Sequence, residues 1–209
     1  MSLFDNFWWS MICCTHLSRV PAAAPGITAS GARGLAMWYH IGMGRWSRAE
    51  IESAFAQHEQ VVVEIGKSWD WSRFADEFTE DALYVEHALG TFQGREQIRE
   101  WITSTMNTFP GSEMPWFPTG WHAIDEDKGW VFCQVLNRMK DPGDGSIHEA
   151  ANITVLKYAG DGLWSYEEDA YNPMNFLVMV QGYIQRCAAL RTASEDALTF
   201  AKNMSWELT

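Results

Sequence analysis

Hydrophobic side chains recur at helical spacing in the first half of the folded part of the sequence. Ser47 and Glu50 form a capping box, and the apolar positions that follow at three- and four-residue spacing predict a helix that ends at Gly66. Asp70 is a candidate N-cap for a second helix. A third helix is predicted over residues 95–108. Between the second and third helices, residues 82–86 alternate like a strand, and a loop containing two glycines follows.

In the second half of the chain the apolar period changes from that of a helix to that of a strand. Four segments alternate in this way: Trp116–Ile124, Trp130–Arg138, His148–Tyr158 and Leu163–Tyr171. Turn-forming residues separate them, which predicts an antiparallel meander. Helices followed by a sheet indicate an α+β fold.

The chain after the sheet is predicted to be helical again. Asn172 and Pro173 are a typical N-cap and first-turn pair, and the apolar residues after them predict a helix over Pro173–Leu190. Thr192 and Glu195 form a second capping box, which predicts a short helix over about Ser194–Met204.

Residues 1–45 differ from the remainder, with one acidic and three basic residues. Within them, Val20–Gly34 is rich in Pro, Ala, Gly and Ser without a period, which predicts flexible chain. We therefore expect an N-terminal extension over residues 1–45, an α+β domain over 46–172, and a helical extension over 173–209. Met43 is an alternative start of translation, which the intact mass of the natively expressed protein would test.

The composition narrows the classes of function. The formal net charge is −12, which argues against nucleic acid and anionic lipid as partners, since both need a basic surface. The apolar run Phe7–Cys14 is too short to span a membrane, and it follows an acidic residue, so a signal peptide has little support.

The four cysteines, two of them adjacent, show no CxxC or zinc spacing and predict free thiols in a reducing, cytoplasmic compartment. The histidines and carboxylates show no metal-ligand spacing, and the glycines form neither a phosphate loop nor a dinucleotide fingerprint. We therefore expect no metal and no cofactor.

One stretch carries a resemblance to a known family. Its pattern is a D-W pair, an F-x-x-D-A turn into a strand, an acidic residue, and G-x-x-x-G-R before a helix. The residues that match are Asp70, Trp71, Phe78, Asp81, Ala82, Tyr84, Glu86, Gly90, Gly94, Arg95 and Ile98. In this order they resemble the SnoaL-like polyketide cyclase and ketosteroid isomerase branch of the nuclear-transport-factor-2-like superfamily, over about residues 47–171.

The resemblance implies a cone-shaped, curved antiparallel sheet packed against the N-terminal helices, with an apolar pocket for a small ligand and frequent homodimerisation through the convex face. It places Glu86 where the isomerases have their general base. The isomerases' second acid and oxyanion tyrosine fall near Thr154 and Val62 in this chain, which counts against steroid isomerisation. A histidine, His87, stands where a proline commonly follows the acid.

Strand alternation, with its phase taken from the resemblance, predicts which residues line the pocket. The expected inner-face residues are Val131, Cys133, Val135, Asn137, Ala150, Asn152, Thr154, Leu156, Glu167, Asp169 and Tyr171. The catalytic candidates are Glu86, Asp169 and His87. The ligand-binding candidates are Tyr84, His122, Asn137, Asn152 and Tyr171. Four tryptophans, Trp101, Trp116, Trp121 and Trp130, either wall the pocket or pack in the core.

Two carboxylates in a desolvated pocket repel each other, and burial raises the pKa of both. One then holds a proton while the other acts as a base, which suits proton abstraction beside a carbonyl, dehydration or aldol-type cyclisation. In the alternative interpretation, Asp169 caps the turn at Asn172 and Glu86 pairs with Arg95. His87 points away from Glu86 unless a bulge turns it inward.

The two asparagines on neighbouring strands bind either a ligand or each other. The functional hypothesis is a cofactor-independent acid–base enzyme of isomerase, cyclase, dehydratase or hydrolase type that acts on a small, largely apolar molecule. The alternative is a non-catalytic ligand-binding or dimeric assembly module of the same fold. A closed aromatic pocket with Glu86 buried would favour the enzyme, whereas a filled pocket would contradict it.

Overall fold

The first helix begins where the capping box predicts. A computed structural model describes residues 44–208, so the expected N-terminal extension up to and including Met43 lies outside the described residues. Helix α2 spans Arg48–Ser68, and the Ser47 hydroxyl accepts a hydrogen bond from the Glu50 backbone N–H at 3.2 Å. The predicted end at Gly66 is wrong. This glycine lies inside the helix because the Pro115 carbonyl approaches so closely that a Cβ would lie 2.1 Å from its oxygen.

The second predicted helix is a 3-10 helix, η1, which spans Trp71–Glu77. The Asp70 side chain does not cap its backbone. Its Oδ1 instead accepts a hydrogen bond from the Ser72 hydroxyl. Helix α3 spans Arg95–Met106, close to the prediction, and a single 3-10 turn, η2, spans Gly111–Glu113.

The six strands form one sheet in the order β2-β1-β6-β5-β4-β3. Their bounds are Phe78–Glu86 (β1), Gly90–Gln93 (β2), Thr119–Asp125 (β3), Trp130–Arg138 (β4), Glu149–Gly160 (β5) and Leu163–Ala170 (β6). The predicted antiparallel meander from β3 to β6 is confirmed. The sheet as a whole is mixed, however, because β1 pairs with β6 in parallel.

The predicted glycine loop after β1 is wrong in part, because residues 90–93 form strand β2 and pair antiparallel with β1. The strand predicted over Trp116–Ile124 also starts late. Trp116 makes only an isolated bridge to Arg138, and regular pairing begins at Thr119. Short strands at an edge depend on their partner strand, so local alternation does not reveal them.

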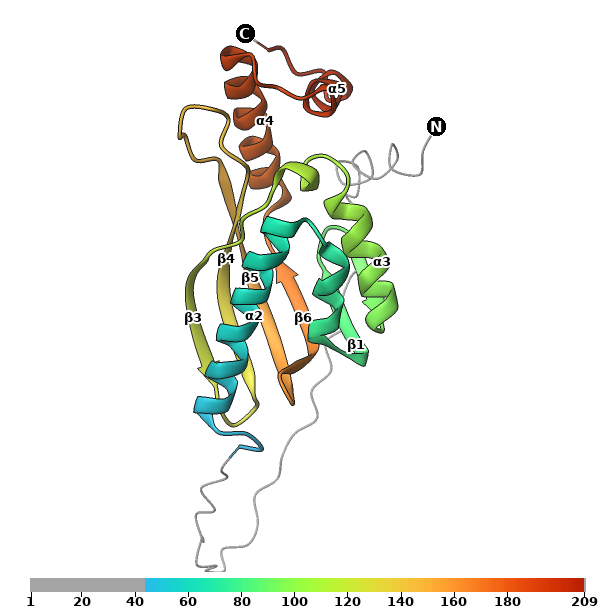
Figure 1. The fold of residues 1–209 in the computed structure, drawn as a ribbon, viewed down its shortest axis with the longest axis vertical. Helices are drawn as coiled ribbons and strands as arrows, with labels where there is room; N and C mark the ends of the chain where they lie inside the picture. The colour runs from blue at the N-terminus through green and yellow to red at the C-terminus, as the bar shows by residue number, and fades with distance from the viewer. Residues whose placement is uncertain (1–43, 209) are drawn as a thin grey trace, which may run out of the picture. The chain divides into compact units, whose positions relative to one another are not determined.

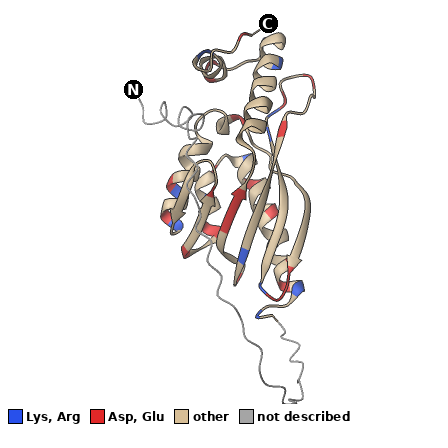
Figure 2. Cartoon of the chain, turned by 180° about the vertical axis from the view of Figure 1, so that it is seen from behind, with Lys and Arg blue, Asp and Glu red and all other residues tan. Residues whose placement is uncertain are grey.

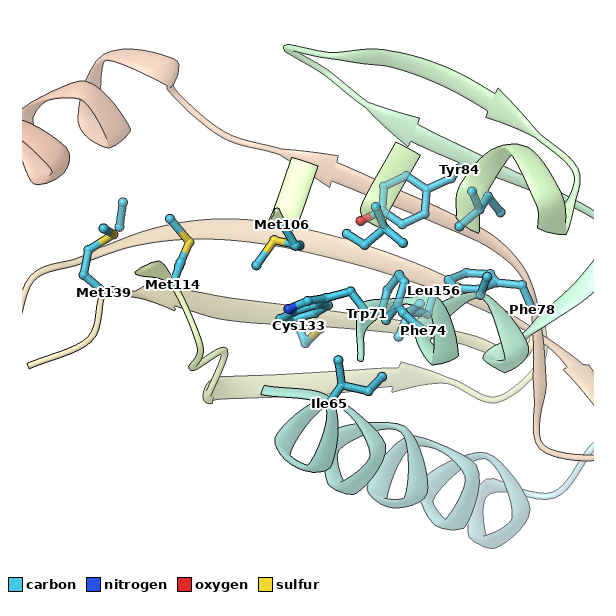
Figure 3. Packing of buried hydrophobic residues seen from close by; sticks show 14 of the residues in the cluster. Ile65, Trp71, Phe74, Phe78, Tyr84, Met106, Met114, Cys133, Met139 and Leu156 are labelled. Atoms are coloured by element: carbon cyan, nitrogen blue, oxygen red, sulfur yellow. The ribbon is translucent and has the colours of Figure 1, made fainter. Parts of the chain in front are cut away.

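Helices α2 and α3 and the 3-10 helix η1 lie over one face of the sheet (Figure 1). The main core lies between these helices and the sheet. Figure 3 shows Trp71 and Phe74 of η1 packed beside Phe78 and Tyr84 of β1 and Leu156 of β5. Fully burying an aliphatic or aromatic side chain of this size contributes about 1.5–3 kcal/mol. The α+β fold class that the sequence predicts is confirmed, and the sheet's inner face is enclosed.

The chain after the sheet forms two helices, α4 (Pro173–Leu190) and α5 (Glu195–Asn203). Helix α4 has the predicted bounds and is capped by Asn172. The predicted cap of α5 is wrong, because Ser194 accepts the hydrogen bond from the Ala197 N–H, whereas the Thr192 hydroxyl donates to the Pro142 carbonyl. None of the helices in residues 44–208 is long and apolar enough to cross a membrane.

A buried hydrogen bond holds α4 to the rest of the domain. The Tyr183 hydroxyl donates to Glu113 Oε2 at 2.6 Å, and Lys140 Nζ lies 3.3 Å from the other oxygen of the same carboxylate. Tyr183→Phe removes this donor and leaves a buried carboxylate oxygen without its partner. We expect a loss of about 1–3 kcal/mol in the free energy of unfolding, measured by urea denaturation.

The matched control is Tyr166→Phe, because the Tyr166 hydroxyl donates to Glu168 at 2.7 Å on the outer face, where solvent replaces it. We expect this variant to lose less than about 1 kcal/mol. Equal losses in the two variants would show that the Tyr183 hydrogen bond has no special part in holding α4.

Candidate functional site

Polar side chains form a hydrogen-bonded row on the inner face of the sheet, across four neighbouring strands. The row comprises Asn137 of β4, Asn152 and Thr154 of β5, Glu167 and Asp169 of β6, and Tyr84 of β1. Every residue of β4 and β5 predicted for the inner face is buried or half-buried, as are the three of β6 and its extension. The predicted phase of the strands is therefore confirmed.

Asp169 lies at the centre of this row. Its Oδ1 accepts hydrogen bonds from Thr154 Oγ1 at 2.5 Å and Asn152 Nδ2 at 2.6 Å, and its Oδ2 accepts one from the Tyr84 hydroxyl at 2.5 Å. Burial raises the pKa of Asp169, and the three donors act against this rise. Both oxygens are engaged, so Asp169 is held as a hydrogen-bond acceptor and does not cap the Asn172 turn, whose backbone is capped by Asn172 itself.

The two asparagines bond each other. Asn137 Nδ2 donates to Asn152 Oδ1 at 2.7 Å and to the Ala150 carbonyl at 3.1 Å. Asn152 in turn donates to Thr154 and Asp169. Because a buried amide needs partners for both its ends, this chain fixes the orientation of Asn152 and its contact with Asp169.

Glu86 ends β1 beside Asp169, its register partner on β6. Only 5% of its surface is exposed. Its Oε2 accepts hydrogen bonds from the Ala88 N–H at 2.8 Å and from the Leu89 N–H. Burial raises the pKa of Glu86, and hydrogen bonds from Tyr171 and from these backbone groups lower it in part.

The predicted alternative partner of Glu86 is engaged elsewhere. Arg95 Nε donates to the Phe78 carbonyl at 2.8 Å. Burial and the nearby Glu86 carboxyl together raise the pKa of Tyr171, the residue that bonds Glu86 from the end of β6. The structure therefore brings Glu86, Asp169, Tyr84, Tyr171 and the asparagine pair into one region.

Glu167 also lies in this region. Its place in the sequence predicts an inner-face side chain, but we did not predict a functional role for it. Its Oε1 lies 3.1 Å from the Tyr84 hydroxyl, and its Oε2 is buried without a hydrogen-bond partner. Burial, with Asp169 close by, raises the pKa of Glu167 well above its ordinary value. The signal in the sequence was the spacing of Glu167 and Asp169, which puts both carboxyls on one face of a strand.

Aromatic rings cover Tyr84. The Trp101 ring lies 4.6 Å from the Tyr84 ring and stacks on Phe92 at the same centroid distance, and Phe74 contacts Tyr84 from η1. Burial and the two carboxyls nearby raise the pKa of Tyr84 well above its ordinary value. The phenol therefore stays protonated and acts as a hydrogen-bond donor.

His87 and His122 do not join this group. His87 points to the opposite face of the sheet, where its Nε2 lies 2.7 Å from Glu168 Oε1. The strand stays regular at this point, so no bulge turns the imidazole inward. His122 is exposed on β3 and contacts the Phe55 ring of α2 at 5.0 Å.

Three of the four tryptophans considered for the pocket wall lie outside the core. Trp116 and Trp121 are exposed. Trp130 contacts the Lys157 ammonium at 4.6 Å, and its register places it on the outer face with Phe132. Only Trp101 packs beside the polar row. Neither a pocket wall nor core packing therefore describes the other three indoles, because strand phase and edge position place them away from the inner face.

A histidine of α2 lies close to the same interior. His58 is buried against the Phe74 and Trp164 rings, and its Nδ1 lies 3.7 Å from Glu77 Oε2. This distance is too long for a hydrogen bond, and both atoms are without other partners. Its aromatic surroundings are those of a core histidine.

A groove of about 440 Å³ lies away from the polar row, between the start of β5 and α4. Residues that line it include Ile147, His148, Ala151, Val178 and Met179. The pocket that the resemblance implies inside the cone stays a prediction. Within residues 44–208, no group of three or more His, Cys, Asp or Glu side chains is placed to hold a metal ion.

No family model matches this chain, and no curated protein matches it. Solved structures that resemble it include a hypothetical protein with a ketosteroid isomerase-like fold from Catenulispora acidiphila, in complex with trimethylamine. That protein is 20% identical, with a TM-score of 0.47, and the match covers 64% of this chain and 93% of that one. At this distance it indicates nothing about the ligand of this chain.

Two further structures are similarly distant. An NTF2-like protein from Anabaena variabilis is 15% identical, with a TM-score of 0.48, and the match covers 63% of this chain and 96% of that one. SalBIII, an epoxide hydrolase/cyclase-like enzyme of pyran ring formation in the polyether salinomycin, is 16% identical, with a TM-score of 0.47 and coverages of 61% and 94%. The order of helices and strands in this chain is the one that its sequence resemblance implies.

Proposed function

We propose that this chain is an acid–base enzyme that needs no bound cofactor and acts on a small, largely apolar molecule at the inner face of the sheet. The reaction is of the isomerase, cyclase, dehydratase or hydrolase type. The observation that carries the proposal is Glu86, a buried carboxyl with raised pKa at the end of the polar row. Such a carboxyl is a stronger base than an exposed one once it has ionised.

The surroundings of Glu86 suit a general base. Two backbone N–H groups orient the carboxyl through Oε2, which leaves Oε1 as the oxygen that receives a proton. Asp169 has both oxygens engaged by three donors. We therefore assign it a positioning role, as the anion that orients Tyr84, in place of the second catalytic role that the sequence suggested.

The ligand would lie against Tyr84, Tyr171 and the ring of Trp101. These groups present apolar surfaces with few polar atoms, which is typical of sites for small organic molecules. No lysine or arginine bonds to Glu86, Glu167 or Asp169 among the described residues. An anionic ligand would therefore meet carboxyls without a balancing cation, which favours a neutral ligand.

A panel of small ketones, lactones, epoxides and unsaturated alcohols tests this function by thermal shift, followed by product analysis for each compound that binds. We expect binding of neutral compounds and no binding of the matching carboxylic acids. If no compound of the panel binds, and the matching acids bind instead, the proposed ligand class is wrong.

A second candidate function, a dimeric module, is favoured by the outer face of the sheet. Figure 2 shows that none of the helices in residues 44–208 crosses this face. Trp121 is 47% exposed and Ile153 is 37% exposed, and Phe132 and Val155 face the same way as register partners. An exposed apolar area of this kind is typical of protein contacts. We propose a homodimer through this face.

Ile153→Glu tests the dimer by placing a charge at the centre of the apolar face. We expect the protein to shift to the monomer in sedimentation equilibrium. Val63→Glu is the matched control, because Val63 is 42% exposed on α2, on the other side of the molecule. A dimer that survives Ile153→Glu, or one that Val63→Glu disrupts equally, would contradict this interface.

The cellular compartment of this protein is also a proposal. Cys133 and Cys187 are free and buried, which fits a reducing compartment. We propose the cytoplasm, which fractionation of cells that express the natural gene would test.

A further inference from the structure

The interior site holds a third carboxyl whose surroundings differ from those of Asp169. Glu167 is 5% exposed on the inner face of β6. Its Oε1 lies 3.1 Å from the Tyr84 hydroxyl, and its Oε2 is buried with no hydrogen-bond partner among residues 44–208. Asp169, two residues further on, receives three hydrogen bonds. The two acids share the Tyr84 hydroxyl, but Asp169 has two further hydrogen-bond donors and Glu167 has none among the described residues.

The protons of this cluster can be counted. The Tyr84 hydroxyl has one hydrogen, and it lies between two carboxyls, at 2.5 Å from Asp169 Oδ2 and 3.1 Å from Glu167 Oε1. The hydrogen can serve only one of them. The shorter contact goes to Asp169. The contact to Glu167 is then a hydrogen bond only if Glu167 itself carries a proton and donates it to the Tyr84 oxygen.

The alternative, in which both acids are ionised, leaves a charge in an unfavourable place. An ionised Glu167 would have two negative oxygens, one facing the Tyr84 oxygen and one without any partner. It would also face the Asp169 anion across the same phenol. Burying an unpaired charge beside a like charge is costly, and a carboxyl in this setting takes up a proton.

We propose that Glu167 is a neutral carboxylic acid that serves as the proton donor of the interior site, and that Tyr84 links it to the Asp169 anion. Without a ligand the acid proton lies on Oε1 and is donated to the Tyr84 oxygen, and the unpartnered Oε2 marks the side on which a ligand would lie. To donate to the ligand, the carboxylic acid group turns so that its O–H leaves Tyr84 and takes the position of Oε2. The group it would meet is a hydrogen-bond acceptor on an uncharged ligand, such as a carbonyl, hydroxyl or ether oxygen. The catalytic role rests on the proposed function, whereas the protonation of Glu167 does not.

The proposed proton transfers from Glu167 to the ligand and from the ligand to Glu86 balance. The O–H bond of Glu167 breaks, and its proton forms a bond to the ligand oxygen or to the leaving hydroxyl. A C–H or O–H bond of the ligand breaks, and its proton binds Glu86. In an isomerisation the ligand keeps its formula, and in a dehydration it loses water. Glu86 is left protonated and Glu167 ionised, and exchange of one proton with solvent at each group restores the starting state.

Infrared difference spectroscopy tests the protonation without any substrate. We expect the carbonyl band of a protonated carboxylic acid to be present in the wild type at pH 7 and absent in Glu167→Gln. We also expect Tyr84→Phe to shift this band, because the acid loses its acceptor. A spectrum without an acid band that depends on Glu167, or a band that Tyr84→Phe leaves unmoved, would overturn the proposal.

The pH dependence of stability gives a second test. Two titratable groups lie close to Glu167: Tyr84, its register partner on β1, and Asp169, two residues further along β6. Cys133 of β4 also interacts electrostatically with Glu167, and His58 of α2 interacts with Asp169. The folded chain holds the Glu167 proton to a higher pH than the unfolded chain does. The wild type therefore loses stability relative to Glu167→Gln as the pH rises above the unfolded value of about 4.3.

We expect the folding equilibrium of Glu167→Gln, relative to the wild type, to increase by up to about tenfold per pH unit above that value, until the folded acid itself ionises. Glu168→Gln is the matched control on the outer face. Hydrogen bonds from Tyr166 and His87 lower the pKa of Glu168, so this variant should lose relative stability only as the pH rises toward about 4.3 and should show no increase above that value. The same sign for both variants would overturn the proposal.

The two proposals fail in different ways. If Glu167 shows no acid band while Glu86→Gln still abolishes turnover, then the proton donor is another group and the proposed function stands. If the acid band is present while Glu86→Gln turns over substrate normally, then the proton inference stands and the proposed base is wrong.

Discussion

Glu86→Gln is expected to reduce turnover of a substrate found in the ligand panel by about 10²–10⁴-fold, the usual contribution of a general base. The amide oxygen of glutamine still accepts hydrogen bonds from the Ala88 and Leu89 N–H groups, which hold the wild-type carboxylate. The fold should therefore survive, and the loss should appear in kcat and not in the melting temperature.

The pH profile gives the same residue a second signature. Glu86 acts as a base only when ionised, and burial raises its pKa. The rate should therefore fall as the pH decreases through a value above the ordinary 4.5 of a glutamate, and this acidic limb should disappear in the residual activity of Glu86→Gln.

The matched control is Glu168→Gln, the same substitution on the outer face of the sheet, where the carboxylate binds His87 and Tyr166. We expect it to keep the wild-type rate and pH profile. Normal turnover by Glu86→Gln, or an equal loss in Glu168→Gln, would show that Glu86 is not the base.

Asp169→Ala is expected to cost about 3–5 kcal/mol in the free energy of unfolding, measured by urea denaturation at pH 7. The substitution leaves the Tyr84, Thr154 and Asn152 donors without their acceptor. Each buried donor left unsatisfied costs about 1–3 kcal/mol. Removal of the buried Asp169 charge relieves its desolvation, but that gain applies to one group and the loss to three.

Two variants separate the parts of this effect. Asp169→Asn keeps Oδ1 as an acceptor for Thr154 and Asn152, so it should lose clearly less than Asp169→Ala. Glu168→Ala, at the next position on β6, removes half-exposed contacts only and should lose less than about 1 kcal/mol. If Asp169→Ala were as stable as Glu168→Ala, the polar row would not be holding the inner face together.

The sequence alone determined most of the local structure, because caps and periodicity act over a few residues. Strand β4 and helix α4 have the bounds that their patterns predict. The Ser47 cap is also where the sequence places it. The predictions are wrong where contacts with residues far away in the sequence determine the local structure. Gly66 continues its helix because Pro115 needs the space, and β2 exists because β1 supplies its hydrogen bonds.

The inner face of the sheet was likewise predictable once the resemblance had supplied the phase of the strands, because alternation then places Glu86, Asp169 and the asparagines there. Alternation also indicated that His87 points away from Glu86, and the regular strand confirms this. The tryptophans could not be assigned in the same way. Whether an indole lies in the core or on the outer face depends on the register of edge strands and on which face the helices cover.

Only the tertiary structure decided which acids interact and how. Tyr84 and Glu167 are 83 positions apart, and they meet because β1 pairs with β6 in parallel with Tyr84 opposite Glu167. That register places a single phenolic hydrogen between two carboxyls, and it gives one of them three donors and leaves the other with a bare oxygen. No local pattern contains this information, because the register between distant strands is set by packing of the whole sheet.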